Sequence, residues 1–302
     1  MKFSNRHASG YLHSFHPADS VTLLQSGPSF FNRLLELIES TQRVLHIQMY
    51  ILDFEGVGAR VEEALHRAAA RGVDIYLVAD GFGSRMLQQA SIDRLLEAGI
   101  QFRWFSRISL FRNTTIGRRL HHKVVVADGQ TALVGGINIA QKYHGSSDRE
   151  AWLDFALELN GPVCLNIEKL CAQIEEREYL PKLKDLPVKA AKGSGIPVSI
   201  RRNDWLRNKK QVFYSYVAAI NRAERSIVLF ASYFLPGNRI RKALEQASKR
   251  GVDITIVLAG NSDIPLAINA TYYLYRWLHR CQIKIYEWNP SVLHAKLAII
   301  DD

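Results

Sequence analysis

The sequence has few cysteines and no long apolar run, and these absences exclude several classes of protein. Its three cysteines form neither a CxxC pair nor a Cys/His cluster, so no zinc site and no disulfide framework is expected. No apolar run reaches the length of about eighteen residues that a bilayer-spanning helix needs. The first residues lack the apolar stretch of a secretory signal peptide. We therefore expect a cytosolic chain that binds no metal and needs no cofactor.

Acidic residues are fewer than basic residues. The chain has 39 Lys and Arg against 29 Asp and Glu, which gives a net charge of +10. An excess of positive charge suits an anionic membrane surface or a nucleic acid. The length of 302 residues and the 47% hydrophobic content are sufficient for two lobes with separate cores.

A short pattern of histidine, lysine and aspartate occurs twice. Its copies are His121-x-Lys123-x4-Asp128 and His294-x-Lys296-x4-Asp301. Each copy lies on a short apolar run of the kind found in buried strands. Because side chains alternate along a strand, the histidine and the lysine of each copy should point the same way. Each aspartate lies an odd number of residues from its histidine, so we expect it to face away and to have a structural role.

The surrounding sequence is duplicated as well. Residues 58–81 and 237–260 align without a gap, and each copy follows an apolar strand, at 43–52 and at 225–235. Both copies predict an amphipathic helix that ends at an Arg-Gly pair and leads into another strand. Further strands are expected at 101–105 and 282–288. This order predicts an α/β fold of two pseudo-symmetric α-β-α lobes, each with a mostly parallel sheet, and one active site at their interface.

Two His-Lys pairs suit phosphoryl transfer. One neutral imidazole can attack phosphorus, while a second, protonated imidazole can give a proton to the leaving alkoxide. Two lysines can stabilise the negative charge that the phosphate oxygens gain in the transition state. The duplicated pattern therefore indicates a reaction through a covalent phosphohistidine.

With these motifs and the internal repeat, the chain resembles the phospholipase D superfamily and, more narrowly, the bacterial cardiolipin synthases. The resemblance covers nearly the whole chain from about residue 21. Further stretches that support it are residues 46–50, 135–143, 161–162, 233–236 and 293–296, together with the Trp152-x-Asp154 segment.

The resemblance implies roles for individual residues. His121 would be the nucleophile, and His294 the general acid and then the general base. Lys123, Lys296 and Asn138 would bind the phosphate oxygens. Asp154 would orient the histidine of the first half and fix its tautomer.

The chain departs from the family pattern at its end. The second motif should be followed by a strand and a Gly-Ser-x-Asn segment, whereas the sequence stops at Asp302. We therefore expect a second lobe that is incomplete, with an apolar sheet edge beside residues 297–300. The expected domains are a first lobe at 1–185, a basic linker at 186–210 and a second lobe at 211–302.

Basic and apolar residues alternate just before the first motif. This segment suits contact with an anionic membrane, where each cation contributes about 1 kcal/mol. The residues expected to make the contact are Arg107, Phe111, Arg112, Arg118 and Arg119. We expect a peripheral protein on the cytoplasmic face of the bacterial membrane.

Three functions remain open at this point. The first is cardiolipin synthesis, with phosphatidylglycerol as donor and acceptor. The second is a phosphodiesterase that hydrolyses lipid or nucleic acid with the same catalytic residues. The third is an inactive, truncated lipid-binding remnant.

Overall fold

The computed structural model describes residues 15–106, 119–175, 195–204, 209–261 and 265–301. The chain divides into two compact units: one is His16–Val198, and the other is Ser199–Asp302 together with the N-terminal residues up to Phe15, so that a boundary lies between Val198 and Ser199. We call them the N-terminal unit and the C-terminal unit. The boundary lies within the segment expected to be a linker, and Ile196–Val198 (β9) of that segment pairs with His16–Ala18 (β1). No helix in the described part of the chain is long and apolar enough to span a bilayer.

The N-terminal unit is built on a seven-stranded sheet, whose strand order is β2-β8-β7-β6-β3-β4-β5. Its strands are Ser20–Gln25 (β2), Val44–Met49 (β3), Asp74–Asp80 (β4), Gln101–Phe105 (β5), Lys123–Ala127 (β6), Thr131–Gly135 (β7) and Phe155–Asn160 (β8). Its helices are Pro28–Ser40 (α2), Val57–Ala70 (α3), Gln89–Glu97 (α4), Gln141–His144 (α5) and Val163–Glu175 (α6). The strand expected at 101–105 is thus confirmed.

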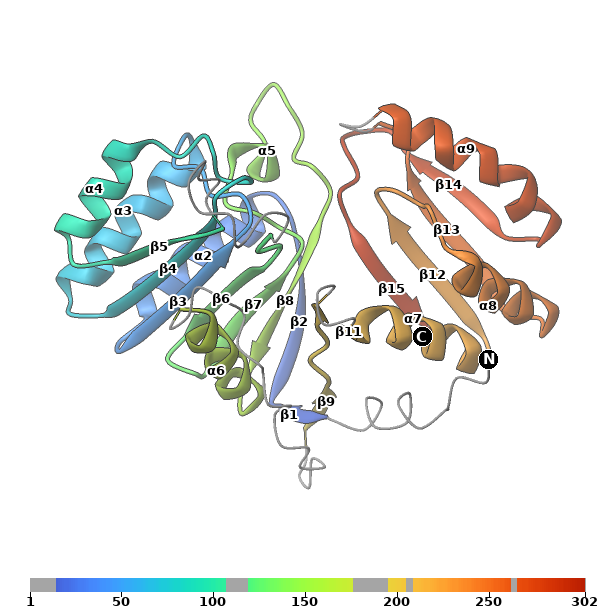
Figure 1. The fold of residues 1–302 in the computed structure, drawn as a ribbon, viewed down its shortest axis with the longest axis horizontal. Coiled ribbons are helices and arrows are strands. Elements are labelled where there is room, and N and C mark those ends of the chain that lie inside the picture. The colour runs from blue at the N-terminus through green and yellow to red at the C-terminus, as the bar shows by residue number, and fades with distance from the viewer. Residues whose placement is uncertain (1–14, 107–118, 176–194, 205–208, 262–264, 302) are drawn as a thin grey trace. The chain divides into compact units, whose positions relative to one another are not determined.

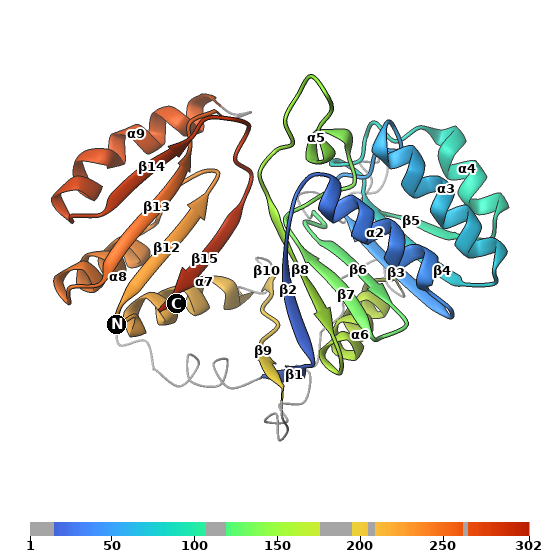
Figure 2. The same ribbon diagram turned by 180° about the vertical axis from the view of Figure 1, so that it is seen from behind.

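Helices cover both faces of this sheet (Figures 1 and 2). The main core lies on the side of α2, α3 and α4, where Leu34, Leu65 and Leu95 pack against Leu45 and Ile47 of β3. Helix α6 packs on the opposite face, against β3, β6, β7 and β8. The α-β-α layering expected from the sequence is present in this unit.

The sheet of the N-terminal unit is mixed, which corrects the expectation of a mostly parallel sheet. Only β3-β4 and β4-β5 are parallel pairs, whereas the four pairs from β2 to β3 are antiparallel. One of these antiparallel pairs has a local cause: β6 and β7 are joined by a tight turn in which Asp128 and Gly129 have φ of 53° and 64°. Such a turn reverses the chain and allows only an antiparallel pair.

The C-terminal unit has a four-stranded sheet of order β14-β13-β12-β15, in which only the β12-β15 pair is antiparallel. Its strands are Ser226–Ala231 (β12), Asp253–Ala259 (β13), Lys284–Trp288 (β14) and Lys296–Ile300 (β15). Its helices are Gln211–Arg222 (α7), Asn238–Lys249 (α8) and Pro265–Arg280 (α9). A short ladder joins Asn203–Asp204 (β10) to Lys209–Lys210 (β11).

The three described helices of the C-terminal unit pack on one face of its sheet. Ile220, Leu244 and Leu278 contact a core that includes Ile227 and Ile256. The described residues therefore give this sheet one helical layer, whereas two were expected. Strand β15 lies at an edge of the sheet.

The predicted sequence repeat is a structural repeat. In each unit a strand, a helix and a parallel strand follow one another, as β3-α3-β4 and as β12-α8-β13. Gly72 and Gly251 follow the two helices with φ of 86° and 87°, as the Arg-Gly pairs predicted. Glycine is favoured there because a side chain would disfavour this left-handed conformation.

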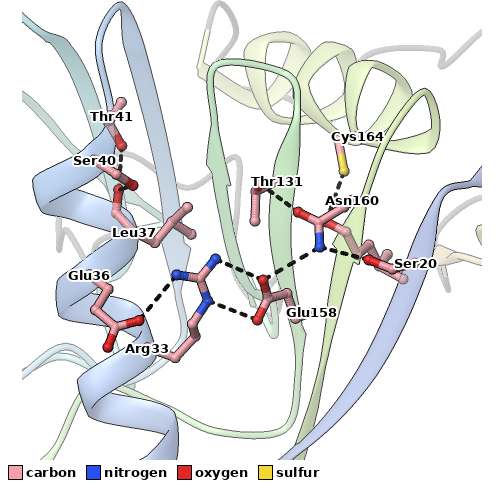
Figure 3. A network of polar contacts seen from close by, with 11 residues as sticks. Ser20, Arg33, Glu36, Leu37, Ser40, Thr41, Thr131, Glu158, Asn160 and Cys164 are labelled. Carbon is pink, nitrogen blue, oxygen red and sulfur yellow. Dashed lines mark hydrogen bonds and ion pairs between the residues drawn. The ribbon is translucent and has the colours of Figure 1, made fainter.

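A polar network connects α2 to the β2-β8 side of the N-terminal sheet (Figure 3). Arg33 donates to both carboxylate oxygens of Glu158 at 2.9 and 2.8 Å. Asn160 donates to Ser20 and accepts from Thr131. These contacts pair the polar side chains that the helix and the sheet bury between them.

Candidate active site

The predicted site residues of the N-terminal unit lie at one end of its sheet. His121 comes just before β6, and Asp154 just before β8, while Asn138 follows β7. β6 and β8 run opposite to β7. The beginnings of β6 and β8 therefore lie at the same end of the sheet as the end of β7. The topology therefore brings His121, Asn138 and Asp154 to this end of the sheet.

Lys123 and His121 are connected through an aromatic side chain. The Nζ of Lys123 donates to the carbonyl oxygen of His121 at 3.2 Å. The same Nζ lies 4.9 Å from the ring centroid of Tyr50, and the His121 ring lies 4.7 Å from that centroid. Lys123 is buried whereas His121 is exposed. One tyrosine thus holds the ammonium by a cation-π contact and presents a flat surface to the imidazole.

The environment of Tyr50 keeps its hydroxyl protonated. Burial, followed by the charge of Asp80, raises the pKa of Tyr50, and Arg119 and Arg85 oppose this shift. Tyr50 is therefore a neutral residue that positions its neighbours.

Asn138 is completely buried and holds the backbone next to Tyr50. Its Oδ1 accepts the N–H of Ile51 at 2.9 Å, and its Nδ2 donates to the hydroxyl of Tyr143 at 2.8 Å. An amide nitrogen has two hydrogens, so these contacts account for one of them. Phosphate binding by Asn138, as the resemblance implies, would use the second.

Asp154 is buried against a glycine. A Cβ at Gly136 would lie 2.1 Å from Oδ1 and 2.4 Å from Oδ2 of Asp154. Only glycine at position 136 therefore leaves room for the carboxylate of Asp154 in this position. The backbone N–H of Asp154 donates to Ser26 at 3.0 Å, and Oδ1 accepts the N–H of Phe155.

The second pair repeats the local geometry of the first. The Nζ of Lys296 donates to the carbonyl oxygen of His294 and lies 3.4 Å from its Nε2. The units differ beside the lysine. Met49 pairs with Lys123 and Ala231 pairs with Lys296, so the position that follows is Tyr50 in one unit and Ser232 in the other.

The two motif aspartates bind backbone at the far end of their strands. Asp128 accepts the N–H groups of Gln42, Arg43 and Val44. Asp301 accepts those of Glu224, Arg225 and Ser226. Each aspartate thereby fixes the start of the strand that pairs with its own motif strand.

Hydrogen bonding also explains the acidity of these aspartates. Burial alone would raise the pKa of Asp128, but the three backbone N–H groups outweigh it and hold that pKa below its ordinary value. The pKa of Asp301 is lowered by the amides of Arg225 and Glu224.

Most of the predicted membrane-contact residues cannot be placed. Arg107, Phe111, Arg112 and Arg118 lie outside the described residues. Arg119 is described, and its Cζ lies 4.9 Å from the ring centroid of Phe82. Among the described residues, no three His, Cys, Asp or Glu side chains are grouped as metal ligands.

Sequence reasoning missed Tyr50 and the segment around Phe82. Tyr50 lies within the apolar run at 43–52, and a role for it becomes visible only when β3 is known to pair with β6. Phe82 belongs to the connection between β4 and α4, which the sequence marks only by its glycines, Gly81 and Gly83.

Comparison with known proteins identifies the family. A family model for the cardiolipin synthase, phospholipase D-like domain matches residues 34–155 and 216–302. Cardiolipin synthase B of Salmonella typhi is 30% identical over 292 residues, which cover 94% of this chain and 70% of that protein. Cardiolipin synthase 1 of Staphylococcus aureus is 27% identical over 283 residues, covering 91% of this chain and 57% of that protein.

A solved structure supports the fold. Phosphatidylserine synthase from Haemophilus influenzae has a TM-score of 0.71 and 12% sequence identity, and the match covers 98% of this chain and 80% of that one. This likeness concerns the fold alone. The match of the family model to both repeats, together with the extent of the relatives, shows that the chain belongs to the cardiolipin synthase family of phospholipase D-like enzymes.

Proposed function

We propose that the protein transfers a phosphatidyl group between two phospholipids and makes cardiolipin from phosphatidylglycerol. The duplicated His-Lys pair is the observation that carries this proposal. Each copy has the same Lys-to-His carbonyl contact and the same backbone clamp by its aspartate. Two imidazoles and two ammonium groups are the set that a double displacement at phosphorus requires.

In the first step, an imidazole nitrogen of His121 attacks the phosphorus of the donor. The P–N bond forms, and the bond from phosphorus to the glycerol headgroup breaks. The departing alkoxide takes a proton from the imidazolium of His294. Lys123, Lys296 and Asn138 stabilise the phosphate oxygens, and Asp154 orients the imidazole of the first half.

In the second step, the terminal hydroxyl of another phosphatidylglycerol attacks the phosphohistidine. His294, now neutral, accepts the hydroxyl proton while the P–N bond breaks and cardiolipin is released. Both steps need the two imidazoles to act on one phosphorus.

The contacts of His121 support its assignment as the nucleophile. Its ring lies against Tyr50, with the two ring centroids 4.7 Å apart. An attacking group gains most from a fixed orientation, because alignment lowers the barrier of the chemical step.

The substrate implies a peripheral enzyme on an anionic membrane, and we propose the cytoplasmic face of the bacterial membrane as its location. Transfer in preference to hydrolysis requires that the lipid alcohol reach the phosphohistidine ahead of water.

Incubation of the purified chain with phosphatidylglycerol vesicles tests the proposal. Cardiolipin together with free glycerol is the expected product pair. Phosphatidic acid would instead indicate a hydrolase, and no product would indicate an inactive lipid-binding protein. Cleavage of a plasmid under the same conditions would point to a nuclease.

A further inference from the structure

The connection between β4 and α4 presents apolar side chains to solvent. We call residues 81–88 the β4-α4 loop. Met86 is 74% exposed and Phe82 is 40% exposed, whereas Leu87 is buried in the main core. Exposed apolar residues are common singly, but here two of them occur on one short turn.

Two cations contact the aromatic ring of this loop. The Cζ of Arg85 is 5.4 Å and that of Arg119 is 4.9 Å from the centroid of Phe82. The loop contains no acidic residue. It therefore combines an apolar tip with positive charge.

Hydrogen bonds fix the loop to the first His-Lys pair. Asp80 accepts the N–H groups of Phe82 and Gly83, and its other carboxylate oxygen accepts that of Leu120 at 2.7 Å. Leu120 immediately precedes His121 in the chain. The loop is thereby tied to the start of the motif strand.

A second set of contacts joins the loop to Tyr50. Ser84 donates to the carbonyl oxygen of Tyr50 at 3.0 Å and accepts the N–H of Leu52 at 2.9 Å. A Cβ at Gly83 would lie 2.2 Å from the same carbonyl oxygen, so only glycine allows this approach. The β4-α4 loop is thus held at the same end of the sheet as His121.

We propose that the β4-α4 loop and Arg119 form a membrane-contact surface for anionic phospholipid. Phe82 and Met86 enter the boundary between headgroups and acyl chains, while Arg85 and Arg119 bind lipid phosphates. Aromatic rings favour that boundary, and guanidinium groups bind phosphate in a bidentate manner. The inference rests on the proposed function in that the substrate is a bilayer lipid.

A nucleic acid fits this surface less well. Sites for single strands stack bases on aromatic faces within a basic groove. Met86 has no planar face, and its flexible thioether side chain is the most exposed apolar group of the loop. An apolar group in this position gains from hydrocarbon and gains little from stacked bases.

Binding to vesicles, measured without turnover, tests the surface. The full chain with His121→Ala is sedimented with vesicles of phosphatidylglycerol or of phosphatidylcholine. The same protein is prepared with Phe82→Ser and Met86→Ser together, with Arg85→Gln, and with Leu165→Ser as a matched control. Leu165 is 48% exposed and lies near Gly129, at the other end of strand β6. Thermal unfolding checks that each variant is folded.

We expect the double serine variant to bind phosphatidylglycerol vesicles at least about tenfold more weakly, because two apolar side chains no longer leave water. Arg85→Gln should weaken binding about fivefold and reduce its dependence on salt. Leu165→Ser should bind like the parent, and phosphatidylcholine vesicles should bind more weakly than phosphatidylglycerol vesicles.

Unchanged binding by the loop variants, or an equal loss in Leu165→Ser, would overturn the proposal. Tighter binding to single-stranded DNA than to vesicles, lost in the same variants, would also overturn it. The proposed function is tested separately by the products of the parent chain. If the loop variants lose vesicle binding but the parent chain makes no cardiolipin, the membrane-contact surface is supported and the proposed function is not. If the parent chain makes cardiolipin but the loop variants bind vesicles normally, the proposed function is supported and the membrane-contact surface is not.

Discussion

At the scale of single residues, Tyr50 is the side chain that connects the first lysine to the first histidine. Its ring lies within 5 Å of both groups, at 4.9 Å from Lys123 Nζ and 4.7 Å from the His121 ring. The contacts are made by the ring face and do not require the hydroxyl. A substitution that removes the ring should therefore have a larger effect than one that removes only the hydroxyl.

Replacing Tyr50 by leucine should lower kcat about tenfold, because ring contacts of about 0.5–1.5 kcal/mol each are lost around the proposed nucleophile, His121. Tyr50→Phe keeps the ring and should retain nearly the activity of the parent. Steady-state kinetics on phosphatidylglycerol measure both variants, with the loss expected in kcat and little change in KM. A leucine variant with normal kcat would show that the ring does not position His121.

At the scale of secondary structure elements, each motif aspartate fixes the strand that neighbours its own. Asp128→Ala removes three hydrogen bonds and should lower the free energy of unfolding by about 1–3 kcal/mol. Asp128→Asn should cost less, because Oδ1 accepts the N–H groups of Arg43 and Val44 and an amide oxygen can replace it. Urea denaturation measures both. The exposed Asp148 provides a control substitution, and a loss of equal size in Asp148→Ala would argue against a specific clamp.

The contact between α2 and β8 predicts a pH dependence of stability. The hydrogen bonds from Arg33 lower the pKa of Glu158 from its ordinary value of 4.5, against an opposing effect of burial. A carboxylate with a lowered pKa stabilises the folded state above its unfolded pKa, and this contribution is lost as pH falls through the folded pKa.

Glu158→Gln should therefore destabilise the chain by about 1–3 kcal/mol at pH 7. The difference from the parent should shrink as the pH is lowered below 4.5, the ordinary pKa of glutamate. Chemical denaturation at several pH values gives the comparison. A difference that stays constant with pH would mean that the charge of Glu158 does not contribute.

The sequence predicted elements better than it predicted their directions and contacts. Apolar runs located β3, β4, β5 and their counterparts, because a short apolar run bounded by turn residues is a clear signal for a strand. The Asp128-Gly129 turn that makes β6 and β7 antiparallel is visible in the sequence. The antiparallel pairing of β6 with β3 and of β8 with β2 and β7 depends on pairing order, which periodicity does not encode. Tyr50 was not predicted for the same reason, since its partners come from a strand more than seventy residues away. The buried bonds of Asn138 also depend on packing that only the fold defines.

At the scale of the whole molecule, the duplication places one His-Lys pair in each of two units. In the proposed mechanism the lysines supply the positive charge that many phosphoryl-transfer enzymes obtain from a metal ion. Turnover should therefore persist in EDTA, at a rate within about twofold of the rate without chelator. Activity that disappears in EDTA and returns with a divalent cation would contradict the mechanism.

The covalent intermediate is the most direct test of the account, because it depends on His121 as the nucleophile and on His294 as the proton donor. Each variant, His121→Ala and His294→Ala, is incubated with a phosphatidyl donor that has a good leaving group, and its intact mass is then measured. The account predicts an acid-labile phosphatidyl adduct on His294→Ala and none on His121→Ala. An adduct on His121→Ala that is absent from His294→Ala would reverse the roles, and the absence of an adduct from both would contradict the phosphohistidine.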